Sequence, residues 1–213
     1  MGKIMDWLAG GLGWLLDSIV QFTGSYGLGI ILSTIIVRLL LYPLTLSQTK
    51  SMIAMKKLQP ELNELQKKYK DQPEEYQRRT MELYQEHKVN PLGGCLPMLI
   101  QLPILWAFFR VLRVIPSGDV SVFLGIWELS QPDPYFVLPL LAAGTTYLQS
   151  RMTATDPSQK SMLVVMPIMI GIFSLSFPSG LVLYWITSNL FSIAQQAWIN
   201  KLYPSEEQGG QAK

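Results

Sequence analysis

Residues 26–46 read YGLGIILSTIIVRLLLYPLTL, a run of 21 residues in which Arg38 is the only charged side chain. A transmembrane helix needs about 20 predominantly apolar residues, because the hydrocarbon core of a bilayer is about 30 Å thick. Four further stretches of similar character follow, at residues 91–112, 134–150, 161–177 and 181–202. A buried helix of a soluble protein explains one such stretch but not five. The sequence therefore predicts an all-α integral membrane protein with five transmembrane helices.

The composition of the 213 residues supports this fold class. Charged residues make up 15% of the chain, against about 25% in a typical soluble domain, and the mean hydropathy is +0.23. The single cysteine and single histidine exclude a disulfide framework and any metal site built from several such side chains. A net charge of +2 is too small to make nucleic acid the main partner. We expect no cofactor and no covalent chemistry, because the predicted spans hold no acid–base or nucleophile–base pair.

The charges are concentrated in one segment. Residues 47–90 hold nine of the 17 Lys and Arg residues and seven of the 15 Asp and Glu residues. With the 151–160 loop and the C-terminal end, 13 Lys and Arg residues lie on one side of the predicted membrane, and three lie on the other. Positive loops face the cytoplasm. The prediction is therefore a bacterial plasma-membrane protein with its N-terminus outside and its C-terminus, including residues 204–213, in the cytoplasm.

Two segments outside the spans are also predicted to be helical. Residues 1–25 carry apolar side chains at helical spacing, which favours an amphipathic helix in the outer interface over a signal peptide, since no A-x-A cleavage site precedes Tyr26. Residues 51–70 and 74–88 predict an antiparallel helical hairpin in the cytoplasm, broken near Pro73. Two interpretations of this hairpin remain open, a solvated loop and a docking element. The remaining four spans occupy residues 91–203, and the turn at residues 178–180 predicts that the fourth and fifth form a hairpin.

Arg38 is the most informative residue of the spans. Twelve residues precede it in its span, so at about 1.5 Å per residue it lies about 18 Å from the outer end. Such an arginine costs at least about 2.5 kcal/mol in lipid unless it is solvated or paired, and no predicted span contains Asp or Glu. Snorkelling, backbone carbonyls and a water-filled groove remain as ways to accommodate it.

Other polar residues of the spans favour the groove. Trp185, Asn189, Ser192 and Gln196 step by four, three and four positions, which places them on one helix face. Further polar residues that are expected to line the same groove are Thr34, Thr45, Gln101, Thr145, Thr146 and Gln149. Hydrogen bonding between helices is the alternative role for each of them. A cationic groove open to the cytoplasm is expected to attract negative charge on an entering chain.

Four short motifs identify a family. They are Ile36-Val37-Arg38 followed by Tyr42-Pro43-Leu44-Thr45; Gln59-Pro60-Glu61-Leu62; Asn90-Pro91-Leu92-Gly93-Gly94-Cys95-Leu96-Pro97 continuing to Gln101-Leu102-Pro103; and Phe177-Pro178-Ser179-Gly180-Leu181-Val182-Leu183-Tyr184-Trp185 running on to Ser188-Asn189-Leu190. Together they closely resemble the YidC/Oxa family of membrane protein insertases, and in particular its short bacterial members. The resemblance covers about residues 24 to 203.

The resemblance implies a membrane protein insertase and chaperone that moves nascent membrane proteins into the bilayer from a hydrophilic groove, which is open to cytoplasm and lipid. It implies substrate contacts for Arg38, Thr34, Tyr184 and Trp185, whereas Gln101 and Gln149 rest partly on the pattern of polar residues. Nascent membrane proteins and the lipid bilayer are the implied partners, together with the ribosome, the signal recognition machinery and the Sec translocase. Relative to larger members, we expect no extra N-terminal span and no large external domain.

Two other functions remain open. A small solute transporter or channel typically shows inverted repeats or interrupted helices at the midplane, and five unequal spans show no such symmetry. An accessory chaperone that assists a larger translocase without inserting proteins itself is compatible with the same sequence.

Overall fold

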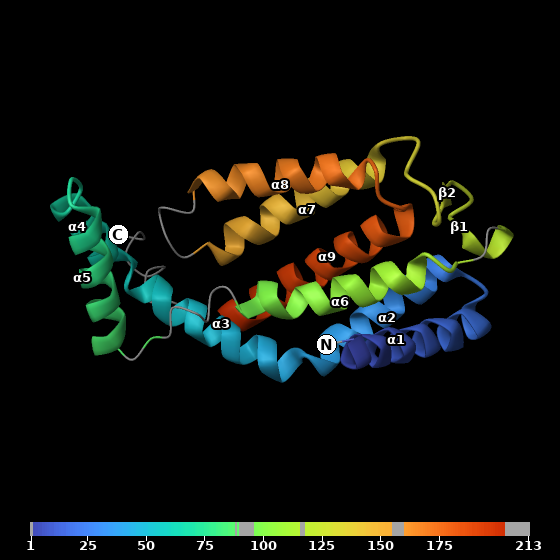
Figure 1. Ribbon diagram of the computed structural model, residues 1–213, viewed down its shortest axis with the longest axis horizontal. Coiled ribbons are helices and arrows are strands. Elements are labelled where there is room, and N and C mark those ends of the chain that lie inside the picture. The colour runs from blue at the N-terminus through green and yellow to red at the C-terminus, as the bar shows by residue number, and fades with distance from the viewer. Residues whose placement is uncertain (1, 88, 90–95, 116–117, 155–159, 203–213) are drawn as a thin grey trace.

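A computed structural model of the chain describes residues 2–87, 89, 96–115, 118–154 and 160–202 and shows an elongated bundle of helices (Figure 1). The helices are α1 (Gly2–Thr23), α2 (Tyr26–Leu40), α3 (Tyr42–Lys57), α4 (Gln59–Lys68), α5 (Pro73–Glu86), α6 (Leu96–Leu112), α7 (Val137–Thr153), α8 (Lys160–Ser174) and α9 (Ser179–Leu202). The prediction of a mostly helical chain is confirmed. The motif at residues 90–95, the loop at 155–159 and the tail at 204–213 lie outside the described residues.

The loop between α6 and α7 departs from the all-α prediction. A short 3-10 helix, η2 (Asp119–Ser121), leads into two antiparallel strands, β1 (Val122–Phe123) and β2 (Trp127–Glu128). The ribbon lies at the end of the bundle opposite to α4 and α5 (Figure 1). Strands of two residues carry no detectable period-2 pattern, so the sequence does not predict them.

The first predicted span is bent. The helix breaks at Leu41, and α3 continues from Tyr42 to Lys57 at an angle of 65° to α2. Pro43 lies in the first turn of α3, where a residue without a backbone N–H interrupts the hydrogen-bond ladder of the preceding helix. The stretch predicted as one helix over residues 26–46 is therefore divided between α2 and α3, and α3 extends past residue 46.

Helix length and hydropathy can be compared with the thickness of a bilayer. Within the described ranges, only the bent pair of α2 and α3 together has the length and hydropathy of a membrane span, and no single helix does. Residues Gln101–Leu112 of α6 and Ser161–Ser174 of α8 form shorter apolar helices.

The α1 helix packs along the bundle. Ala9, Leu12 and Leu16 are buried in the main apolar cluster, where they meet α2 and α6. The two helices α1 and α2 approach each other closely at Gly29, which has no side chain. A Cβ atom at this position would lie only 2.9 Å from Cδ1 of Leu16. Because α1 runs antiparallel beside α2 (Figure 1), it does not have the orientation predicted for a helix lying across the outer end of the spans.

The core of the bundle is centred on α9. Its buried residues contact α2 and α6 on one side and α7 on the other, and the ring of Tyr184 stacks on that of Phe108 at 4.0 Å. The predicted hairpin of the fourth and fifth spans implies that α8 packs mainly against α9. Instead, α8 packs extensively against α7. A turn at residues 175–178 separates α8 from α9, and α7 packs against both of these helices.

The loop between β2 and α7 holds the ends of two helices. The backbone carbonyl of Gln131 accepts hydrogen bonds from the N–H and the hydroxyl of Ser179, the first residue of α9. The buried carboxylate of Asp133 accepts hydrogen bonds from the N–H groups of Tyr135 and Leu138 at 2.9 and 2.7 Å, and from the indole of Trp127 at 2.9 Å. These contacts satisfy donors that a helix N-terminus leaves free.

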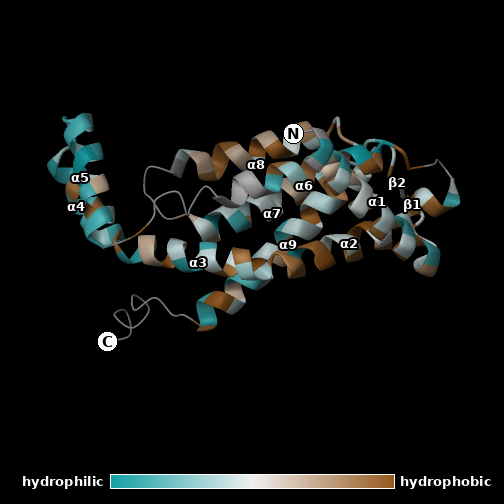
Figure 2. Cartoon of the chain, turned by 60° about the horizontal axis from the view of Figure 1, so that its bottom comes forward, coloured by the Kyte–Doolittle hydropathy of each residue, from teal (hydrophilic) through white to brown (hydrophobic). Residues whose placement is uncertain are grey.

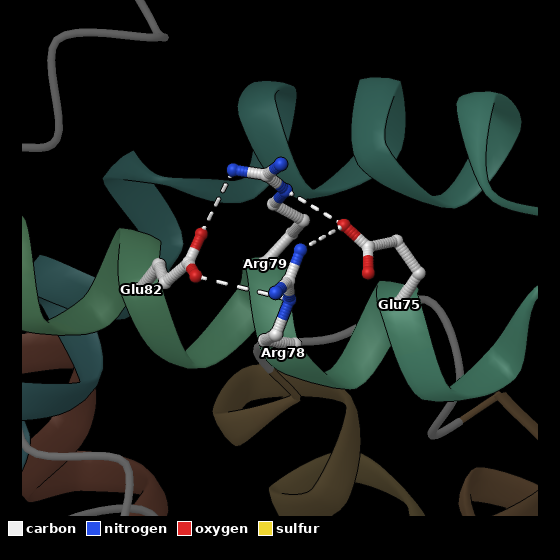
Figure 3. A network of polar contacts seen from close by, with 4 residues as sticks. All are labelled: Glu75, Arg78, Arg79 and Glu82. Atoms are coloured by element: carbon white, nitrogen blue, oxygen red, sulfur yellow. Dashed lines mark hydrogen bonds and ion pairs between the residues drawn. The ribbon is translucent and has the colours of Figure 1, made fainter.

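The helices α4 and α5 pack on one another at the far end of α3. Leu58, Leu62, Leu83 and Tyr84 form a small apolar cluster together with Met55 of α3. The outer surfaces are hydrophilic (Figure 2). On α5, the carboxylate of Glu75 pairs with Arg78 and Arg79, and Glu82 pairs with the same two arginines (Figure 3).

Candidate functional site

Arg38 connects three helices inside the bundle. It lies in the last turn of α2, and its Nη2 donates to Oε1 of Gln101 on α6 at 3.0 Å. Its Nε donates to the hydroxyl of Ser188 on α9 at 3.1 Å, and Nη2 contacts the same hydroxyl. All of these partners are neutral, and no carboxylate pairs with Arg38 among the described residues. The guanidinium is therefore held by hydrogen bonds while its positive charge stays uncompensated.

Gln101 links Arg38 to the core. Its amide oxygen accepts from Arg38, which leaves the amide nitrogen to donate to the hydroxyl of Tyr184. Tyr184 is 1% exposed, and Phe108 covers one face of its ring. Because Tyr184 cannot move without disturbing the core, it sets the orientation of the Gln101 amide and, through it, that of Arg38.

A second polar cluster surrounds Asn189 on α9. With its amide nitrogen donating to Oε1 of Gln149 at 2.6 Å, its amide oxygen accepts from Nε1 of Trp185 at 3.2 Å and from the Thr146 hydroxyl at 3.0 Å. Trp185 Nε1 also lies 3.0 Å from the Thr146 hydroxyl. This cluster ties α9 to α7, as the Arg38 cluster ties it to α2 and α6.

Both clusters border one cavity of about 620 Å³. Its lining runs from Arg38 along α3 as far as Met55, toward α4 and α5. Its lining includes Arg38, Leu41, Thr45, Gln48, Thr49, Met52, Met55, Gln101, Leu102, Leu105, Thr146, Gln149, Met162, Met166, Ile170, Trp185, Ser188, Asn189, Ser192, Gln195 and Gln196. Among the residues that the structure describes, Arg38 is the only charged one in this lining. The cavity is thus a polar, cationic space within an apolar bundle.

The structure brings six of the eight predicted site residues to this cavity: Arg38, Gln101, Gln149, Trp185, Asn189 and Ser192. It places the other two elsewhere. Thr34 is 1% exposed, and its hydroxyl donates to the carbonyl of Ile30 in its own helix at 2.6 Å. Tyr184 is buried against Phe108 behind Gln101. The substrate contacts predicted for all eight residues stay predictions.

The cavity lining also contains polar residues that were not predicted as site residues, among them Ser188, Gln48 and Gln195. Ser188 lies four residues after Tyr184, on the face of α9 that meets α2, and the sequence does not show which face does so. Gln48 was assigned to the segment after the first span, although α3 continues that span past it. Gln195 is the neighbour of Gln196, which the sequence does place on the polar stripe. It also follows Ser192 by about one helical turn, so the two side chains lie on nearby parts of the helix surface.

The available groups define what the site can do chemically. The lining offers one guanidinium, several amides and several hydroxyls, which bind anionic or peptide groups by hydrogen bonds. Within the described ranges, no group of three His, Cys, Asp or Glu residues is arranged to hold a metal ion. The lining therefore suits the binding of anionic or peptide groups through hydrogen bonds.

Comparisons with known proteins show which family the chain resembles. The family model described as "60Kd inner membrane protein" matches residues 18–207. The chain is 46% identical to the membrane protein insertase YidC of Caldanaerobacter subterraneus over 87% of this chain and 90% of that protein. It is 47% identical to that of Fusobacterium nucleatum over 94% and 98% of the two chains.

A solved structure extends the comparison to three dimensions. The crystal structure of an active YidC insertase, with its first transmembrane domain resolved, superposes with a TM-score of 0.74 at 35% sequence identity. The match covers 89% of this chain and 45% of the solved chain, so this chain spans less than half of that protein.

Proposed function

This chain belongs to the YidC family of membrane protein insertases, and we propose that it inserts membrane proteins by receiving a polar segment of the substrate in the cavity beside Arg38. It is a bacterial inner membrane protein, and nascent membrane proteins and lipid are its partners. The observation that carries the proposed mechanism is an uncompensated arginine on the wall of a 620 Å³ cavity within an apolar helix bundle.

The charge of Arg38 supports a role in capturing substrate. A cation among neutral partners in a low-dielectric surrounding attracts an anion more strongly than an exposed one does. Arg38 already makes hydrogen bonds to Gln101 and Ser188, so its side chain is held in place before a substrate arrives. An acidic tail that enters the cavity thereby gains a charge-assisted hydrogen bond without a large reorganisation of the protein.

The lining of the cavity also supports sideways release. Leu102 and Leu105 of α6 and Met166 and Ile170 of α8 border the cavity, and Leu102 is 52% exposed. An apolar substrate segment leaves between these helices, because each Leu or Ile gains about 0.3–0.6 kcal/mol at the centre of the bilayer. Burial of apolar residues in lipid drives the release, and no covalent bond is made or broken.

The direction of transfer follows from the orientation we propose. The segment 47–90 holds nine of the 17 Lys and Arg residues, so α4 and α5 lie in the cytoplasm and the turn between α1 and α2 lies outside. The cavity then faces the cytoplasm, and the loop from η2 to α7 covers the outer end. We propose five crossings: the bent α2–α3 pair, α6, α7, α8 and α9. The hydrophilic hairpin of α4 and α5 is a docking site for the ribosome, the signal recognition machinery or the Sec translocase.

The test is insertion by the purified chain in proteoliposomes, with two single-span substrates that differ only in an acidic or a neutral tail. We expect Arg38→Ala to reduce insertion of the acidic-tail substrate by about tenfold, which corresponds to about 1.4 kcal/mol, and to affect the neutral tail much less. Arg38→Lys is expected to retain most of the activity, since it keeps the charge. Arg113→Ala, at the opposite end of the bundle, is the matched control.

The results separate the parts of the proposal. Normal insertion of the acidic tail by Arg38→Ala would show that charge capture is wrong. If the native chain inserted neither substrate, it would not act as an insertase by itself, and an accessory role would replace the proposed function.

A further inference from the structure

The part of the cavity next to α4 and α5 contains two glutamines without partners. Gln48 of α3 is 5% exposed and Gln195 of α9 is 8% exposed, and both line the cavity. Neither the amide nitrogen of Gln48 nor either polar atom of the Gln195 amide has a hydrogen-bond partner among the described residues. Buried amides are nearly always paired in native proteins, because unpaired ones are costly. Two of them facing one cavity indicate a ligand that supplies the missing hydrogen bonds.

The neighbouring polar groups contrast with this pair. The hydroxyl of Thr49 donates to Oε1 of Gln196 at 3.4 Å, and Nε2 of Gln196 donates to Asn200 at 2.9 Å. The amides of Gln196 and Asn189 are therefore used in contacts within the protein, whereas the amide nitrogen of Gln48 and both polar atoms of the Gln195 amide make no such contact with the described residues.

Methionines provide the apolar surface of the same zone. Met52 and Met55 of α3, and Met162 and Met166 of α8, line the cavity. Methionine is flexible and polarizable, so it packs against side chains of different shape. Because the described residues of the lining include no charged side chain other than Arg38, this zone combines adaptable apolar contacts with neutral hydrogen-bonding groups.

We infer that Gln48 and Gln195 form a second binding site, which takes the main-chain peptide groups of the segment being transferred, while the methionines take its side chains. A glutamine amide carries the same donors and acceptor as a peptide group, so it pairs with any main chain. This inference rests on the proposed function, since it presupposes a substrate in the cavity.

The two sites then differ in what they recognise. Arg38 responds to the charge of the substrate tail, whereas Gln48 and Gln195 respond to its backbone and are indifferent to its charge. An unfolded segment needs such partners, because its N–H and C=O groups lose water as it enters the bundle.

The experiment uses the full chain in proteoliposomes with the acidic-tail and neutral-tail substrates. Gln48→Met together with Gln195→Met removes the amides and keeps the length of the side chains. We expect insertion of both substrates to fall by the same factor, about tenfold. Gln21→Met together with Gln131→Met makes the same change at two exposed positions outside the cavity lining, one on α1 and one in the loop after β2, and is expected to leave insertion unchanged.

A third substrate tests the backbone contact directly. Ester bonds in place of the tail's peptide bonds remove the main-chain N–H donors. The native chain is expected to insert this neutral substrate poorly, and the double methionine variant is expected to differ from it by less than about twofold, because the contacts are already lost.

Stability distinguishes a binding role from a structural one. Because the amides have no partners in the described part of the chain, the double methionine variant is expected to unfold at the native Tm or above it. Unchanged insertion, or a loss confined to the acidic tail, would overturn the inference. A lower Tm with equal losses for peptide and ester substrates would assign the glutamines to packing and also overturn it. If the native chain inserted no substrate, the proposed function itself would fail, and the inference with it.

Discussion

The guanidinium of Arg38 on α2 donates to the hydroxyl of Ser188 on α9, 150 positions later in the chain. One turn further along α9, the hydroxyl of Ser192 instead donates to the carbonyl of Ser188 in its own helix, at 2.9 Å. The two serines therefore line the same cavity with different contacts. Ser188 joins two helices through a charged donor, whereas Ser192 joins none.

This difference predicts different effects of alanine at the two positions. Ser188→Ala leaves a partly buried charged donor without one of its partners, so we expect the free energy of unfolding to fall by about 1–3 kcal/mol. Ser192→Ala is expected to change it by less than about 0.5 kcal/mol. Chemical denaturation in mixed micelles measures both. Equal losses at the two positions would contradict the role assigned to Ser188.

A substitution that neutralises the positive charge of Arg38 tests whether this charge matters apart from the shape of the groove. Glu at position 101 keeps the size of Gln101 and pairs its carboxylate with Arg38. We expect Gln101→Glu to raise the Tm and to lower insertion of an acidic-tail substrate by about tenfold, because the charge is neutralised. Gln101→Leu, which removes the hydrogen bonds and keeps the charge free, is expected to lower the Tm instead. An active Gln101→Glu variant would show that the groove does not act through its charge.

Hydropathy and helical spacing were sufficient to predict part of the site. The low charge of residues 26–46 isolates Arg38, and the steps of four and three from Trp185 to Asn189 and Ser192 place these three side chains on one wall. Both are local properties of a helix. Nothing beyond the periodicity of the chain was needed to bring these residues to one cavity.

The remaining site residues depend on how helices meet. Thr34 shares a face with Arg38, but that face is packed against its neighbours at Thr34 and opens only at Arg38. Gln48 reaches the cavity because the chain stays helical after the bend at Leu41, and α3 carries this residue along the cavity wall. Hydropathy alone places Gln48 outside the span. The positions of helix ends and bends are set by tertiary contacts that no single segment encodes.

The outer end of α2 offers a steric test. A Cβ atom on Gly27 would lie 2.0 Å from Cδ2 of Phe123, so any side chain there displaces β1 from α2. We expect Gly27→Ala to lower the free energy of unfolding by about 1–3 kcal/mol, as overpacking commonly does. Gly144→Ala in α7, where a Cβ would meet nothing within 4 Å, is the control and is expected to be neutral or slightly stabilising. Equal Tm values for the two variants would argue against the packing of β1 on α2.

Asp133 is expected to be the main anchor of the outer loop. Its carboxylate is buried and accepts three hydrogen bonds, from Trp127, Tyr135 and Leu138. Asp133→Ala leaves these donors unpaired next to the N-terminus of α7, where a negative charge is favourable. We expect a loss of about 2–4 kcal/mol in the free energy of unfolding. Asp119→Ala, at an exposed position of the same loop, is expected to change it by less than about 0.5 kcal/mol.

The ion pairs of α5 predict a dependence on pH. Hydrogen bonds from Arg78 and then Arg79 hold the pKa of Glu75 below its ordinary value of 4.5. Because the folded state binds the proton less readily than the unfolded one, the contribution of Glu75 is fully present above pH 4.5 and is lost as the pH falls through the lowered pKa. A titration of the Glu75 carboxyl carbon by NMR measures this directly, and we expect Arg78→Ala to move the pKa toward 4.5 more than Arg79→Ala does. High salt is expected to reduce the shift, since the pair is exposed and screened. A pKa that neither variant alters would show that the two arginines do not hold Glu75 in solution.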